Sequence, residues 1–124
     1  MERIKVTADE VMSTLRAVVA ERPDYVYARP EADNRAAACL YVHHDDGTAK
    51  PGCLVGTVLH RLGVPLVELE KVEGEGAVSA VSTVATLEWH DAPSSALQAA
   101  QEVQDDGGTW AEALAAAEEM FARL

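Results

Sequence analysis

The stretch that decides the fold is Gly52-Cys-Leu-Val-Gly-Thr-Val-Leu-His-Arg-Leu-Gly63. Its large apolar residues recur at helical spacing and share one broad face: Leu54, Val55, Val58, Leu59 and Leu62. Gly63 follows the last of them and can adopt the left-handed conformation that commonly ends a helix. We therefore predict a core helix from about residue 53 to residue 62.

Gly56 lies within this helix, on the face that also carries Cys53 and His60. A glycine-flanked helix start can bind an anion through its backbone amides, but the Lys-Ser/Thr pair of a P-loop is missing here. We favour tight packing instead, because a residue without a side chain lets a neighbouring element approach closely. The candidate for that element is a β-hairpin earlier in the chain.

The hairpin is predicted from two runs of strand-forming residues, Tyr25-Val-Tyr27 and Cys39-Leu-Tyr-Val42. A polar stretch separates the two runs, so they predict a short antiparallel pair near residues 25–43. Asp45-Asp-Gly47 follows and has the composition of a turn.

Capping motifs mark the first and last helices of the chain. Thr7-Ala-Asp-Glu10 is a capping box, and the apolar stripe after it ends before Pro23. Thr109-Trp-Ala-Glu112 repeats this pattern before an alanine-rich terminal helix. We expect the first helix to run from about residue 8 to residue 22.

Three further helices are predicted between residues 65 and 106. A short helix begins at Pro65, the stretch 77–87 is assigned to a helix by its apolar spacing, and a longer helix runs from Asp91 to Asp106. Gly107-Gly108 separates the longer helix from the terminal one, which predicts a helical hairpin. The fold class is therefore mainly α (α+β), with about five helices and a short β-hairpin in a single domain, residues 1–124.

The charge is distributed unevenly. The formal net charge is −11, and residues 63–124 carry −10 of it, because this half contains twelve acidic residues and only two basic ones, Lys71 and Arg123. That half would repel a nucleic-acid backbone and attract a basic protein surface. The longest uncharged stretches are too short for a membrane span, and the N-terminus has no continuous apolar region of secretory type, so we expect a cytoplasmic protein.

Three segments of the sequence carry a resemblance: Cys39-Leu-Tyr-Val42, the stretch from Gly52 to Gly63, and Gln101-Glu-Val-Gln-Asp-Asp-Gly-Gly-Thr-Trp110 with the helix after it. Together they resemble a group of small proteins of actinobacteria and their phages. The group carries no established activity, so the resemblance implies a genomic setting and no mechanism. In a phage setting, a small acidic protein is expected to bind or inhibit a host or defence protein.

The favoured hypothesis is a non-enzymatic protein-interaction module whose acidic half binds a basic partner surface. Its candidate partner-binding residues are Glu102, Asp105, Asp106, Glu112 and Trp89. Mimicry of DNA, in which carboxylates stand in for phosphates, is a special case that requires the acids to form an exposed stripe. No cofactor is expected under this hypothesis.

Two alternatives stay open. Cys39, His43, Cys53 and His60 are the candidate zinc ligands of a metal-binding domain or a small metal-dependent enzyme, although their spacing differs from that of a zinc knuckle. The competing interpretation of the cysteines is two reduced, buried apolar residues without a disulfide. The second alternative is a homo-oligomer with Trp89 and neighbouring valines in the interface.

Overall fold

The computed structural model describes residues 2–28, 40–45, 47–88 and 91–123. These residues form six helices and four short strands, so the prediction of a mainly α fold with a small β part is confirmed. The helices are α1 (Ala8–Glu21), α2 (Leu54–Arg61), α3 (Leu66–Glu70), α4 (Ala77–Val84), α5 (Ala92–Asp105) and α6 (Trp110–Arg123). The strands are β1 (Ile4–Val6), β2 (Val42–Asp45), β3 (Thr48–Pro51) and β4 (Ala85–Leu87).

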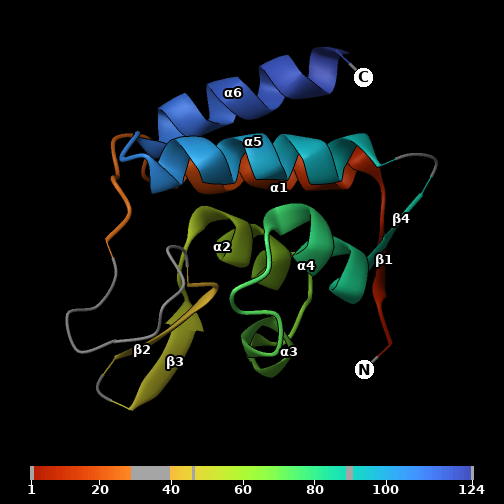
Figure 1. The fold of residues 1–124 in the computed structure, drawn as a ribbon, viewed down its shortest axis with the longest axis vertical. Helices are drawn as coiled ribbons and strands as arrows, with labels where there is room; N and C mark the ends of the chain where they lie inside the picture. The colour runs from red at the N-terminus through yellow and green to blue at the C-terminus, as the bar shows by residue number, and fades with distance from the viewer. Residues whose placement is uncertain (1, 29–39, 46, 89–90, 124) are drawn as a thin grey trace.

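Helix α5 lies at the centre of the helical packing and contacts α1, α2, α4 and α6. Figure 1 shows α6 on one side of α5 and the shorter helices α2, α3 and α4 on the other. The apolar faces of α1, α2, α4 and α5 meet in one core, which includes Leu15, Leu54, Leu59 and Leu97. In the described part of the chain, no helix combines the length and the apolar character that a membrane span requires.

Both predicted capping boxes are present. The Thr7 hydroxyl accepts a hydrogen bond from the Glu10 amide at 3.1 Å, and the Glu10 carboxylate accepts one from the Thr7 amide at 2.9 Å. Thr109 and Glu112 make the same reciprocal pair at the start of α6. Each box satisfies two of the amides that the first turn of a helix leaves without an intrahelical partner.

The hairpin lies later in the chain than the sequence predicts. Strands β2 and β3 are antiparallel: Val42 pairs with Pro51 at one end and Asp45 pairs with Thr48 at the other. The hairpin therefore occupies residues 42–51, and its predicted position near residues 25–43 is wrong. Gly47 of the predicted turn lies between the two strands with a φ of 79°, and Asp46 lies outside the described residues. This glycine permits a short connection between adjacent segments, which favours local pairing. Val26 instead bridges to Thr109, beside the start of α6.

A second, parallel pair of strands joins the start of the chain to residues 85–87. Ile4, Lys5 and Val6 pair with Ala85, Thr86 and Leu87 respectively. The prediction of a helix over 77–87 is therefore confirmed for 77–84 and wrong for β4. Pairing with β1 and burial of Ala85 favour the extended conformation there.

Gly56 brings α2 against the backbone of Tyr41, the residue just before β2, so the predicted close approach at this glycine is present. A Cβ atom at this position would lie 2.8 Å from the Tyr41 Cα and closer still to the Tyr41 carbonyl oxygen. The backbone just before the helix contacts the same segment, since the Gly52 amide donates to Tyr41 O at 2.8 Å and the Cys53 amide donates to Leu40 O at 2.9 Å. The absence of a side chain at Gly56 is thus a packing requirement.

Gln104 connects three helices from a buried position on α5. Its Oε1 accepts hydrogen bonds from the Leu54 amide at 2.8 Å and from the Trp110 Nε1 at 3.1 Å. Leu54 is the first residue of α2, and the side chain of Cys53, at the N-cap, makes no capping bond. Gln104 therefore supplies the missing cap from another helix.

The close approach at Gly56 leads to a stability prediction. Gly56→Ala is expected to lower the free energy of unfolding by about 1–3 kcal/mol, because the Tyr41 backbone has to move away. Chemical denaturation followed by circular dichroism measures this change. Thr57→Ala, at a half-buried position on the same helix, is the matched control, with an expected change within about 0.5 kcal/mol. Equal stability of Gly56→Ala and the wild type would contradict the packing requirement.

Candidate functional site

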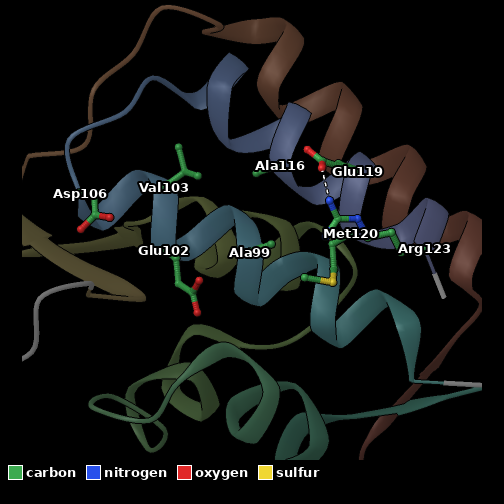
Figure 2. A pocket seen from close by; sticks show the side chains of 8 residues that line it. All are labelled: Ala99, Glu102, Val103, Asp106, Ala116, Glu119, Met120 and Arg123. Atoms are coloured by element: carbon green, nitrogen blue, oxygen red, sulfur yellow. Dashed lines mark hydrogen bonds and ion pairs between the residues drawn. The ribbon is translucent and has the colours of Figure 1, made fainter.

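A groove between α5 and α6 contains two of the residues that the sequence predicts for partner binding. Its volume is about 300 Å³. The lining residues, drawn in Figure 2, are Ala99, Glu102, Val103 and Asp106 from α5 and Ala116, Glu119, Met120 and Arg123 from α6. The apolar members are half-buried and the charged members are exposed, so the groove combines an apolar surface with charged edges.

Three carboxylates and one guanidinium line the groove, which gives it a formal charge of −2. Glu102 and Asp106 are four residues apart on α5 and therefore neighbours on one helix face. The Glu102 carboxylate accepts a hydrogen bond from Gln98 Nε2 at 3.3 Å. Within residues 2–28, 40–45, 47–88 and 91–123, no donor or cation contacts the Asp106 carboxylate. Glu119 forms an ion pair with Arg123 on the same helix.

The other predicted partner-binding residues do not line this groove. Asp105 accepts a hydrogen bond from Gln104 Nε2 at 3.2 Å, and its partial burial raises the pKa of the carboxyl group. Glu112 belongs to the capping box of α6, where hydrogen bonds from Thr109 lower its pKa. Trp89 lies outside the described residues.

Glu119, Met120 and Arg123 also line the groove, although the sequence does not predict them as site residues. Their positions on α6 become adjacent to α5 only after the two helices pack. A usable signal was the spacing of Glu119 and Arg123, because oppositely charged residues four apart meet on a helix surface.

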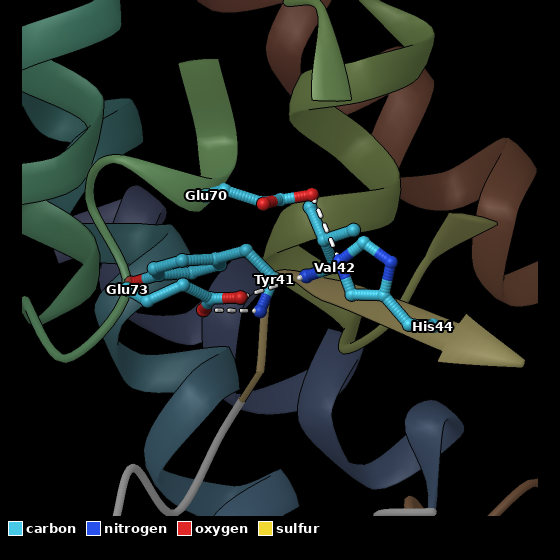
Figure 3. A network of polar contacts seen from close by, with 5 residues as sticks. All are labelled: Tyr41, Val42, His44, Glu70 and Glu73. Atoms are coloured by element: carbon cyan, nitrogen blue, oxygen red, sulfur yellow. Dashed lines mark hydrogen bonds and ion pairs between the residues drawn. The ribbon is translucent and has the colours of Figure 1, made fainter. Parts of the chain in front are cut away.

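Two carboxylates between residues 68 and 75, those of Glu70 and Glu73, bind the hairpin and the residue before it. The Glu73 carboxylate accepts hydrogen bonds from the backbone amides of Tyr41 at 2.8 Å and Val42 at 3.1 Å (Figure 3). Glu70 contacts His44 Nε2 at 2.9 Å. These contacts attach the start of β2 to the segment around α3, so the two carboxylates serve the fold here.

Tyr41 is a buried member of the same network. Its hydroxyl donates to the Glu75 carbonyl oxygen at 2.6 Å. Burial raises the pKa of Tyr41 to about 12, and the nearby Glu73 carboxylate contributes to the increase. The phenol is therefore a structural donor and resists ionisation.

The predicted zinc ligands do not form a ligand cluster in the described part of the chain. His43 is buried with its Nε2 2.7 Å from the Tyr27 hydroxyl. His60 is exposed in the last turn of α2, where its Nδ1 lies 3.0 Å from Val64 O. Cys53 precedes the same helix, about 10 Å of helical rise away from His60. No group of three or more His, Cys, Asp or Glu residues suitable for a metal was found among the described residues.

Cys53 is buried, as expected, but it is disulfide-bonded, so the prediction of a reduced thiol is wrong. Cys39 is the only other cysteine in the sequence and lies outside the described residues. A sulfur atom in a disulfide is no thiolate ligand, which weakens the zinc alternative at Cys53. Disulfides are also uncommon in cytosolic proteins, which weighs against the cytoplasmic expectation.

Comparison of the chain with protein families, curated protein sequences and solved structures finds no match in any of the three. The interpretation of the site therefore depends on its own geometry.

Ionisation of Tyr41 leads to a prediction about alkaline stability. Because its pKa in the folded protein, about 12, exceeds the unfolded value of about 10, its contribution is complete below pH 10 and is lost as the pH rises through 12. Denaturant unfolding at a series of pH values should show a smaller loss over this interval in Tyr41→Phe than in the wild type. Equal losses in both proteins would contradict the assignment to Tyr41.

The disulfide at Cys53 leads to a second prediction. Reduction and Cys53→Ser are each expected to lower the free energy of unfolding, by about 2–4 kcal/mol. Thermal unfolding with and without a reductant measures this effect. Cys39→Ser removes the other cysteine of the sequence and should lower the stability as much as reduction does.

Native mass spectrometry of the untagged chain tests the same bond independently and reports bound zinc at the same time. Alkylation of both cysteines without prior reduction, or one zinc ion per chain, would contradict the disulfide.

Proposed function

We propose that the protein is a non-enzymatic interaction module that binds a basic surface of another protein through the α5–α6 groove. The observation that carries this proposal is the combination, in one groove, of an apolar lining with the carboxylates of Glu102, Asp106 and Glu119. Protein interfaces commonly have this anatomy, in which apolar contacts lie inside a polar rim. A basic partner supplies the complementary charge.

The surplus of acidic residues supports the same function at longer range. Residues 63–124 carry a formal charge of −10, and a field of that sign accelerates the encounter with a basic partner. Several of these carboxylates, including Glu73 and Glu112, are engaged in hydrogen bonds within the fold. Glu102 and Asp106 are exposed and lie on the groove, so they are better placed to face a partner.

The proposed setting is a phage-derived accessory protein that binds or inhibits a host protein. The sequence resemblance to actinobacterial and phage proteins motivates this setting. Inhibition of a DNA-binding protein by mimicry of DNA is a special case of the same function, because the partner would then present its phosphate-binding surface.

The two alternatives have less support. The zinc-binding alternative requires a thiolate at Cys53, where the structure has a disulfide. The homo-oligomer alternative rests on Trp89, which lies outside the described residues, and on neighbouring valines, of which Val81 and Val84 are buried. Measurement of the solution mass distinguishes a self-associating protein from a monomer.

Charge reversal tests the proposed function. In a pull-down, the wild-type protein is expected to retain the partner. The double variant Glu102→Lys/Asp106→Lys is expected to lose it. Added salt should release the same partner from the wild type, because exposed charges are screened.

The matched control is Glu2→Lys combined with Glu88→Lys, which makes the same change in net charge at two exposed positions outside the groove. This control should retain the partner. The proposal is wrong if both double variants bind alike, or if the partner withstands salt.

A further inference from the structure

Arg123 is the one positively charged residue among the described residues that line the α5–α6 groove. Its guanidinium pairs with the Glu119 carboxylate, one helical turn earlier on α6 (Figure 2). In residues 63–124 the only other cation is Lys71, which pairs with Glu68 at 3.1 Å and does not line the groove. The groove therefore already holds one arginine, and it is supplied by the chain itself.

We propose that Arg123 occupies the position of a partner's arginine and must leave Glu119 when the partner binds. This inference rests on the proposed function and adds two statements to it. The partner inserts an arginine side chain into the groove, and Arg123 acts as an internal competitor for the same carboxylate.

The shape and chemistry of the groove favour an arginine side chain. A volume of about 300 Å³ is at the lower limit of small-molecule sites, so the groove can accommodate a long side chain rather than a whole helix. An arginine can lay its aliphatic stem along Val103 and Met120 while its guanidinium reaches a carboxylate at the edge. Its planar fork matches the two oxygens of a carboxylate.

The internal ion pair is weak enough to be displaced. Both side chains are about two-thirds exposed, at 67% for Arg123 and 66% for Glu119. Pairs of this kind on a helix surface contribute about 0.2–0.5 kcal/mol. Competition of that size lowers the apparent affinity for a partner by about twofold.

The experiment uses the full chain and a fluorescent peptide with arginines on one helical face and leucines on the other. Affinity is measured by fluorescence anisotropy at fixed salt. We expect Arg123→Gln to bind the peptide about twofold more tightly than the wild type. Lys71→Gln makes the same change in net charge outside the groove and is expected to leave the affinity closer to that of the wild type.

A double-mutant cycle assigns the effect to Glu119. Glu119→Gln should weaken binding, and adding Arg123→Gln to it should give no further gain, because the carboxylate for which the two arginines compete is gone. A peptide with citrulline in place of arginine, which keeps the shape but not the charge, should lose the benefit of Arg123→Gln. Spermidine competing as well as the arginine peptide would show that any long cation suffices and would overturn the assignment to arginine.

The outcomes separate this inference from the function on which it rests. In one outcome, the wild type binds the peptide and charge reversal of Glu102 and Asp106 abolishes this binding, but Arg123→Gln and Lys71→Gln have the same affinity. In that case only the proposed competition by Arg123 is wrong. If groove and control reversals affect the peptide equally, the groove is not the binding site and both proposals fail.

Discussion

Gln104 joins α5, α2 and α6 through a single buried oxygen atom. That oxygen accepts hydrogen bonds from the first amide of α2 and from the indole of Trp110, so it fixes where two helices begin relative to α5. A buried acceptor of this kind is costly to remove, because its two donors would lose their partner away from water. The α5–α6 groove depends on the same arrangement, since its two walls are held together at the Gln104–Trp110 end.

Much of the helical framework is predictable from local patterns. The capping boxes at Thr7 and Thr109 identify their helices because the motif satisfies amides within a few residues of itself. The close approach of another backbone segment to Gly56 is predictable for a similar reason, since a glycine on a helix face leaves space for a neighbour. The parallel pairing of β1 with β4 is not, because three-residue strands carry little pattern and their partners lie about eighty residues apart.

The candidate site is harder to predict than the fold. Glu102 and Asp106 stand out in the sequence as part of an acidic segment, but the sequence does not separate them from Asp105 and Glu112, which have local hydrogen-bonding roles. The contribution of α6 to the groove depends on how two helices pack, and a charge count carries no information about that packing. The disulfide state of Cys53 is likewise a matter of proximity in space and compartment, which spacing alone does not supply.

The pairing of β1 with β4 also has a consequence for the order of folding. Helix α1 can form from its own residues, because its capping box is local, whereas Ile4 finds its partner Ala85 only after most of the chain has been made. Closing so long a loop costs chain entropy before any contact offsets it. During synthesis, β1 therefore has no partner until residues 85–87 have been made, so an element at the start of the sequence depends for its pairing on one far along the chain.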